Sequence, residues 1–230
     1  MDPKLKHMQQ SWAENSTRYT DPIGITGRRP DETEFQITVN DVARKLDLSA
    51  HEITSILDVG CNNGYLLHRL NANAIYEIGV DFCFIPLTHA RSTYPDALFC
   101  QAEAQHLPFP SDFFDRVLCY NMLHYLPSVE SALDVCRECW RVLKRGGCMI
   151  VGDLFPREFQ ERIPEEKRQH WTNPARPFMH RMDNWLFIPV HDLITLFESL
   201  GASTKIMRQP EELPGFEYRL DVVVEKGESL

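Results

Sequence analysis

The sequence contains no long hydrophobic run, and no stretch approaches the roughly 20 apolar residues that a membrane-spanning helix needs. Its first residues, MDPKLKHMQQSWAEN, also lack the apolar centre of a secretory signal peptide. The seven cysteines are an odd set scattered from Cys61 to Cys148, mostly in apolar runs, which is not the pattern of a disulfide framework. From these absences we expect a cytoplasmic protein with reduced, buried thiols and no membrane span.

An excess of positive charge is missing as well. The 24 Lys and Arg residues are outnumbered by 33 Asp and Glu residues, which gives a formal net charge of -9. Such a balance disfavours nonspecific binding to nucleic acid or to anionic membranes. A chain of 230 residues that is 43% hydrophobic can bury a core without disulfide bonds. We therefore expect one globular domain over residues 1–230.

Short apolar runs alternate with segments of helical periodicity along the chain. The expected strands cover residues 53–59, 75–81, 97–100, 113–122, 148–151, 204–207 and 218–225. The expected helices cover residues 39–48, 64–70, 86–94, 129–143 and 190–200. This alternation predicts a doubly wound, Rossmann-like α/β fold, with a mostly parallel sheet of about seven strands and helices on both faces.

The helix expected over residues 129–143 has the most regular apolar face. Ser128 is a suitable N-cap, and residues 144–147, Lys-Arg-Gly-Gly, are expected to give a basic last turn and then a stop. Cys136 and Cys139 form a Cys-x-x-Cys pair inside this helix. A zinc site needs about four ligands, and no second pair lies nearby, so these residues are interpreted as core thiols rather than as a metal site.

Two segments fall outside the alternation. The first, residues 1–35, is polar and rich in turn formers, and we expect it to form an arm or a short helix followed by a loop. The second, residues 156–189, holds five of the 15 prolines and interrupts the pattern after the fifth strand. The domain thus divides into an N-terminal arm (residues 1–35), a cofactor-binding core (53–155), a lid insertion (156–189) and a final helix with two strands (190–226).

The chemically informative stretch is the turn Asp58-Val-Gly-Cys-Asn-Asn-Gly64 between the first expected strand and helix. Glycine and asparagine tolerate the positive φ that such a turn can require, so the backbone can pass close to a ligand. Asp81 ends the next strand, where a carboxylate can accept hydrogen bonds from ribose hydroxyls. Because ligands of open α/β sheets bind at the carboxyl ends of the strands, these features predict a nucleoside-containing cofactor.

These motifs resemble those of the class I S-adenosylmethionine-dependent methyltransferases, especially the small type 11 group. The turn at residues 58–64 is similar to the family's first motif, which holds the methionine end of the cofactor, and Asp81 matches its ribose-binding acid. Residues 102–109 resemble the third motif, whose acid and following amide face the adenine. Residues 121–126 look like the end of the fourth strand, beneath the transferred methyl group, and residues 143–147 match the turn before the fifth strand.

The resemblance covers residues 53–155 and implies S-adenosyl-L-methionine as the cofactor. It is much weaker over residues 1–35 and 156–189. One departure is Asn62, which stands where the family usually has a second glycine; asparagine is the best substitute for a left-handed conformation, so we expect binding to be retained. The cofactor-binding residues that the resemblance implies are Asp58, Gly60, Asn62, Gly64, Asp81, Phe82, Glu103, Ala104 and Asn121.

Two other functions are weighed against this one. A nicotinamide-dependent oxidoreductase needs Gly-x-Gly-x-x-Gly, which Gly60, Asn62 and Gly64 do not provide. An acid at position 58 also suits the ammonium of a methionine moiety better than a diphosphate. A non-catalytic, cofactor-binding partner of another methyltransferase is the other alternative, and the intact motif residues argue against it.

The acceptor would be methylated by direct in-line displacement, for which positioning can supply several kcal/mol. His124 lies where the acceptor would approach, and a neutral imidazole there can accept a proton. The alternative is that His124 shapes the pocket or caps the next helix. In the arm, Trp12, Arg18 and Tyr19 are expected to fold over the cofactor, although Trp12 could equally serve packing.

The lid insertion contains no acid between Lys167 and Met182, a local reversal of sign in an acidic chain. Arginines suit an anionic group, so we expect a small-molecule acceptor of sugar, carboxylate or phosphonate type. The alternative is a solvated loop paired with Glu161, Glu165 and Glu166. The residues predicted to bind the acceptor are Tyr19, Arg168, His170, Arg176 and Arg181.

Overall fold

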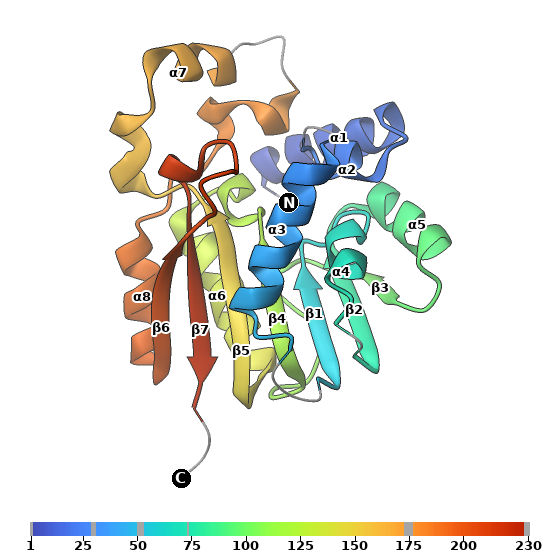
Figure 1. The fold of residues 1–230 in the computed structure, drawn as a ribbon. Helices are drawn as coiled ribbons and strands as arrows, with labels where there is room; N and C mark the ends of the chain where they lie inside the picture. Colours follow the sequence, from blue (N-terminus) through green and yellow to red (C-terminus); the bar gives the residue numbers. More distant parts are fainter. Residues whose placement is uncertain (1, 29–30, 50–52, 73, 173–176, 228–230) are drawn as a thin grey trace.

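Seven strands form one sheet in the order β3-β2-β1-β4-β5-β7-β6 in the computed structural model (Figure 1). The structure describes residues 2–28, 31–49, 53–72, 74–172 and 177–227. The strands β1 to β5 are parallel, whereas β7 runs antiparallel to both β5 and β6. The strands are β1 (Ser55–Val59), β2 (Tyr76–Asp81), β3 (Leu98–Gln101), β4 (Phe114–Tyr120), β5 (Leu143–Leu154), β6 (Ala202–Arg208) and β7 (Leu220–Lys226).

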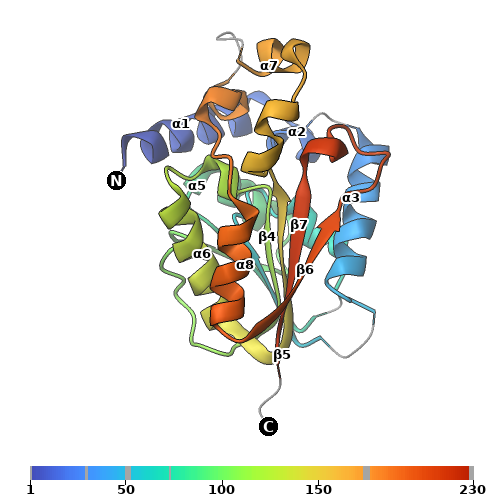
Figure 2. The same ribbon diagram turned by 90° about the vertical axis from the view of Figure 1, so that its left-hand side faces the viewer.

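Helices cover both faces of the sheet, which confirms the doubly wound fold. Figure 2 shows α6 and α8 on one face and α3 on the other. Within the described residues no helix is both long and apolar enough to cross a membrane. The helices are α1 (Pro3–Arg18), α2 (Pro22–Ile25), α3 (Glu32–Lys45), α4 (Tyr65–Leu70), α5 (Phe84–Thr93), α6 (Val129–Val142), α7 (Glu165–Thr172) and α8 (Val190–Ser199).

The core has two layers, one on each face of the sheet, because successive side chains of a strand point to opposite faces. Leu57 and Val117 point toward α6 and α8, whereas their neighbours Ile56 and Leu118 point toward α3 and α4. All four side chains are fully buried, as expected for parallel strands covered on both faces. Cys136 and Cys139, on α6, are fully buried in the first layer.

The N-terminal segment is more helical than the sequence predicts. Instead of a short helix and a loop, α1 is 16 residues long, and α3 begins at Glu32 rather than near Val39. Side-chain caps explain the early starts, because Asp2 accepts a hydrogen bond from the Lys4 amide (2.7 Å) and Asp31 accepts one from the Glu34 amide (3.1 Å).

The end of α6 also differs from the prediction. Its N-cap is Ser128, as expected, but the helix ends at Val142, and residues 144–147 belong to β5. Strand pairing overrides the helical pattern, because Leu143 pairs with Phe114 of β4. Lys144 then reaches Asp115 across the sheet, with Nζ 2.8 Å from Oδ1.

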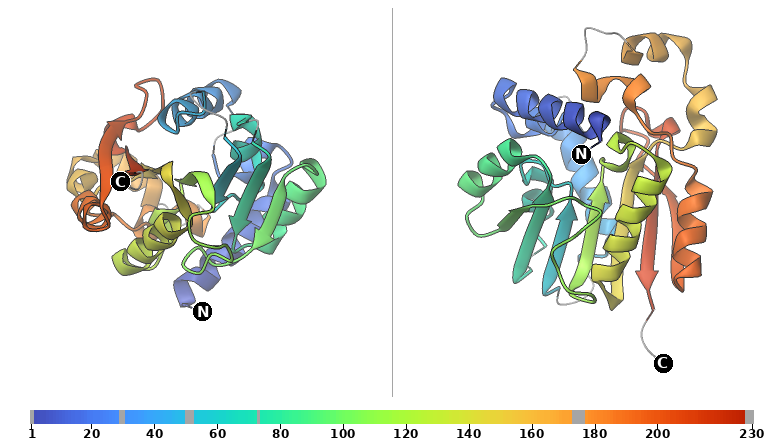
Figure 3. Two further views of the ribbon diagram at one scale, coloured as in Figure 1. Left: turned by 90° about the horizontal axis from the view of Figure 1, so that it is seen from below. Right: turned by 180° about the vertical axis from the view of Figure 1, so that it is seen from behind.

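The N-terminal helix and the lid insertion lie side by side over the carboxyl ends of the parallel strands (Figures 1 and 3). The lid consists of α7 and short 3₁₀ turns, including residues 178–180. Met8 and Trp12 of α1 pack against Met179 of the lid and Cys83 at the start of α5. The two segments outside the α/β alternation thus form one roof over the edge of the sheet where ligands bind.

Candidate functional site

A cavity lies beneath this roof, at the carboxyl ends of β1, β2 and β4. Every cofactor-binding residue that the sequence predicts lines it, except Gly64. The predicted residues that meet there are Asp58, Gly60, Asn62, Asp81, Phe82, Glu103, Ala104 and Asn121. We call this space the cofactor cavity.

Asp58 presents a buried carboxylate to the cofactor cavity. The residue is 3% exposed, and among the described residues its carboxylate has no hydrogen-bond or ion-pair partner. Burial, together with the charge of Asp81, raises the pKa of Asp58 to about 8. A buried carboxylate of this kind is stabilised by a cation, so Asp58 fits the ammonium of the methionine moiety.

Asp81 holds the glycine-rich turn in place. Its carboxylate accepts hydrogen bonds from the amides of Asn62 (2.9 Å) and Cys83 (2.8 Å). Burial nevertheless raises its pKa to about 6, and these two bonds oppose the rise. Asn62 has a φ of 51°, the left-handed conformation expected from the sequence. Asp81 therefore lies at the cavity beside the turn that it holds, and its carboxylate can also accept hydrogen bonds from ribose hydroxyls.

The two glycines of the turn have different roles. Gly60 lines the cavity with a φ of 82°. Gly64 lies outside the cavity at the N-cap of α4, and a Cβ there would lie 2.6 Å from the Phe99 ring. Gly64 is thus required for close packing of α4, a distinction that the sequence motif does not make.

Gly64→Ala should destabilise the fold by about 2–3 kcal/mol, because it combines strain at a φ of 71° with a clash against Phe99. Gly201→Ala is the matched control, since Gly201 has a φ of 83° and a Cβ added there would meet nothing within 4 Å. Urea unfolding should show a loss of only about 1 kcal/mol in the control. Equal losses in the two variants would show that packing against Phe99 does not matter.

The roof of the cofactor cavity comes from α1. Leu5, Met8 and Trp12 line it, and the Trp12 ring meets Tyr125 edge-on at 5.5 Å between centroids. Of the three arm residues expected over the cofactor, Trp12 lines the cofactor cavity. Tyr19 lines neither this cavity nor the second cavity, which is described next, and Arg18 is exposed. The sequence offered no motif for Leu5 or Met8, since their role depends on how α1 docks.

A second cavity adjoins the first. Four residues line both: Arg28, Phe35, Asn121 and Tyr125. The rest of its lining includes His124, Asp153, Phe155 and Arg219 from the sheet edge, and Lys167, His170, His180 and Trp185 from the lid. We call this space the acceptor cavity, after the role that we propose for it below.

The lid contributes fewer predicted residues to the acceptor cavity than expected. His170 lines it, but Arg168 and Arg181 do not. Arg168 donates hydrogen bonds to the backbone carbonyls of Ile163 (2.7 Å) and Glu161 (2.7 Å), and Arg181 pairs with Asp183. Local partners within the lid satisfy both guanidinium groups, which a charge pattern cannot reveal. Arg176 lies outside the described residues.

His124 is buried in the wall of the acceptor cavity, 2% exposed. Its ring packs edge-on against Phe155 and Trp185, at centroid distances of 5.1 and 5.7 Å. Burial lowers its pKa to about 3, so the imidazole is neutral at physiological pH. Its Nδ1 is buried and has no hydrogen-bond partner among the described residues. The next helix, α6, is capped by Ser128 and not by His124.

Two arginines that sequence reasoning missed lie at the acceptor cavity, Arg28 after α2 and Arg219 before β7. Each donates to one oxygen of Asp153, Arg28 to Oδ2 and Arg219 to Oδ1, both at 2.9 Å. Asp153 is 2% exposed, yet the arginines outweigh burial and lower its pKa to about 2. Neither arginine belongs to a motif, so only the fold brings them together.

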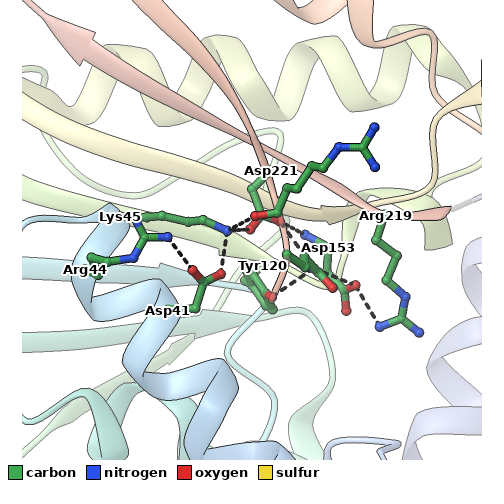
Figure 4. A network of polar contacts seen from close by, with 9 residues as sticks. Asp41, Arg44, Lys45, Tyr120, Asp153, Arg219 and Asp221 are labelled. Atoms are coloured by element: carbon green, nitrogen blue, oxygen red, sulfur yellow. Dashed lines mark hydrogen bonds and ion pairs between the residues drawn. The ribbon is translucent and has the colours of Figure 1, made fainter. Parts of the chain in front are cut away.

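A network of buried charges supports Asp153 from behind (Figure 4). Asp221 accepts a hydrogen bond from the Asp153 amide (2.8 Å), and Gln209 donates to Oδ1 of Asp153 (3.2 Å). The Lys45 side chain is fully buried and bridges Asp221 (2.5 Å) and Asp41. The network therefore ties α3, β5 and β7 together directly behind the acceptor cavity.

The sequence is similar to those of several known proteins. A family model described as a methyltransferase domain matches residues 57–151. The chain is 30% identical over 175 residues to a fatty-acid O-methyltransferase of Mycolicibacterium smegmatis, a match that covers 71% of this chain and 59% of that protein. It is 26% identical over 159 residues to the mitochondrial arginine-hydroxylase NDUFAF5 of Rattus norvegicus, covering 67% of this chain and 41% of that protein.

Solved structures share the fold over almost the whole chain. N-methyltransferase NodS from Bradyrhizobium japonicum WM9, in complex with S-adenosyl-l-homocysteine, has a TM-score of 0.68 at 14% identity, covering 96% of this chain and 100% of that chain. The fold and the motif define an α/β protein with a nucleoside site. Residues 57–151 match the methyltransferase domain family, and this match, the fold and the similar curated methyltransferase support an S-adenosylmethionine-dependent methyltransferase of the type 11 group, with S-adenosylmethionine as its cofactor.

Proposed function

We propose that this protein transfers a methyl group from S-adenosylmethionine to an oxygen or nitrogen of a small molecule in the acceptor cavity. The observation that carries the proposal is that the two cavities adjoin, because four residues line both of them: Arg28, Phe35, Asn121 and Tyr125. The cofactor supplies an activated methyl group on a sulfonium. A methyl donor in one cavity and a nucleophile in the other would meet where the two cavities adjoin, as in-line displacement requires.

The chain's own residues supply positioning and exclusion of water. The roof formed by Met8, Trp12 and Met179 is apolar and buried, which keeps solvent from the reacting groups. His124 is neutral and its Nδ1 faces no protein partner among the described residues, so we infer that it orients the acceptor through a hydrogen bond. With a pKa of about 3 it is a weak base, so positioning supplies most of the rate.

The test is calorimetric titration of the protein with S-adenosylmethionine, S-adenosylhomocysteine and NADH. Micromolar binding of the first two ligands is expected, and its loss in Asp81→Ala, because Asp81 accepts from the turn amides and faces the cofactor cavity. Thermal melting of the variant serves as the folding control. Binding of NADH alone would favour an oxidoreductase, and binding of none of the three would remove the cofactor assignment.

An anionic acceptor is the finer part of the proposal. Arg28 and Arg219 support it better than the lid arginines do, together with Lys167 and His170 at the cavity. The chain covers only 41% of the NDUFAF5 relative, which is named a hydroxylase, so the fold by itself does not fix the reaction. Copurification with an obligate partner, and turnover only in its presence, would favour the non-catalytic alternative.

Seven free cysteines, six of them buried, support a reducing location such as the cytoplasm.

A further inference from the structure

The cluster formed by Arg28, Asp153 and Arg219 brings two guanidinium groups together at the acceptor cavity. Two guanidinium groups share a single carboxylate, and each occupies one of its oxygens. Both arginine side chains are mostly buried, with exposures of 22% and 21%. Each guanidinium has five N–H donors and gives only one of them to Asp153. One anionic group could therefore bind beside the cluster and accept hydrogen bonds from the others.

Two unpaired polar atoms lie in the same wall. Nε of Arg219 and Nδ1 of His124 are buried and have no hydrogen-bond partner among the described residues. Phe155 connects them, because the His124 ring lies 5.1 Å from its centroid and the Arg219 guanidinium carbon also lies 5.1 Å from it. A buried unpaired polar atom costs about 1–3 kcal/mol, so a ligand oxygen that reaches either atom would stabilise this wall.

The Asp153 backbone adds an independent sign of function. Its φ is 56°, the left-handed conformation that non-glycine residues rarely adopt. The network behind it imposes this conformation, because Asp221 accepts its amide hydrogen. Strain held in place by surrounding structure is typical of ligand sites. Asp153 is thus a positioning residue for the two arginines.

The acceptor cavity also holds charged groups of both signs away from the cluster. Lys167, His170 and His180 add basic groups from the lid, and Asp31 and Glu34 add acids from the opposite side. Both acids have interaction partners. The remaining walls are aromatic, from Phe35, Tyr125, Phe155 and Trp185.

We propose that the acceptor carries a carboxylate, held by Arg219 and Arg28, and an aromatic or otherwise apolar body that packs against these walls. The inference rests on the proposed function and narrows its anionic acceptor to one class. A carboxylate suits this place because its two oxygens match guanidinium geometry. A phosphonate dianion would bring a second negative charge into a cavity that Asp31, Glu34 and Asp153 also line.

The test uses benzoate, cinnamate and 2-naphthoate, each beside its neutral amide, with phenylphosphonate as the dianion. Each is titrated by calorimetry into protein saturated with S-adenosylhomocysteine. At least one acid should bind about tenfold or more tightly than its amide and than phenylphosphonate. Arg219→Gln should abolish this preference, whereas Arg208→Gln, an exposed arginine at the end of β6, should retain it.

Two further variants separate positioning from folding. Asp153→Asn keeps the shape and removes the negative charge between the two arginines. Acids should then bind at least as tightly and phenylphosphonate should gain affinity relative to them, while S-adenosylhomocysteine affinity stays the same. His124→Phe keeps a ring without Nδ1 and should weaken acid binding severalfold. The inference is overturned if no acid outbinds its amide, if phenylphosphonate binds best, or if the preference survives Arg219→Gln. Failure of S-adenosylhomocysteine to bind would instead overturn the proposed function, and the same samples report both.

Discussion

Asp58→Asn should weaken the binding of S-adenosylmethionine about 100-fold at pH 8 and yet leave the empty protein at least as stable as the wild type. The carboxylate has no partner among the described residues, so the substitution removes no contact within that part of the protein. Breaking a buried charge pair with a ligand costs about 2–5 kcal/mol. Asparagine retains the size of the side chain without the buried charge. Calorimetry and urea unfolding measure the two effects.

The pH dependence of the same site has a definite sign. In the empty protein the pKa of Asp58 is raised to about 8, well above its unfolded value, so its ionisation lowers stability as pH rises from about 4 to 8. Cofactor binding pairs the carboxylate and releases its proton. At pH 7, titrations in buffers of different ionisation enthalpy should therefore show proton release, which Asp58→Asn should largely remove. Equal release in the two proteins would contradict the pairing of Asp58 with the cofactor.

Lys45→Met should destabilise the fold by about 3–5 kcal/mol at pH 7.5, the largest stability loss that we expect from a single substitution. Methionine fills the volume of lysine but leaves Asp41 and Asp221 buried without their shared cation. Burial already raises the pKa of Asp221, and Lys45 opposes that rise. Urea unfolding at pH 7.5 measures the loss.

The Lys45 deficit should shrink on acidification. Without the lysine, the folded-state pKa of Asp221 is raised further above its unfolded value, so folding takes up protons and stability increases as pH falls. Unfolding at pH 5.5 should therefore recover part of the loss. Arg44→Gln is the control, because Arg44 also pairs with Asp41 but its side chain is 60% exposed, and it should cost less than about 1 kcal/mol. A Lys45→Met protein as stable as the control would contradict a structural role for the network.

The cofactor half of the site could be predicted from sequence because it lies within one strand–turn–helix unit and its neighbours. Asp58, Asn62 and Asp81 are placed by local backbone geometry at the ends of adjacent strands, so their spacing along the chain reports their proximity. Even there the motif could not separate Gly60, which lines the cavity, from Gly64, which packs against Phe99.

The acceptor half could not be predicted because its residues come from distant segments. Arg28, Asp153 and Arg219 meet only after the arm docks and β7 inserts between β5 and β6. The lid arginines drew attention through local charge, but Arg168 is satisfied by carbonyls of its own segment. A cluster of like charges along a sequence does not identify the partners of each charge.

The most direct measurement is a crystal structure of the protein with S-adenosylhomocysteine. From the two cavities we predict the amino-acid ammonium beside Asp58, the ribose beside Asp81, and the sulfur at the wall formed by Asn121 and Tyr125, facing the acceptor cavity. A ligand bound with its sulfur turned away from that wall, or seated in the acceptor cavity beside Arg219, would contradict the proposed methyl transfer between them.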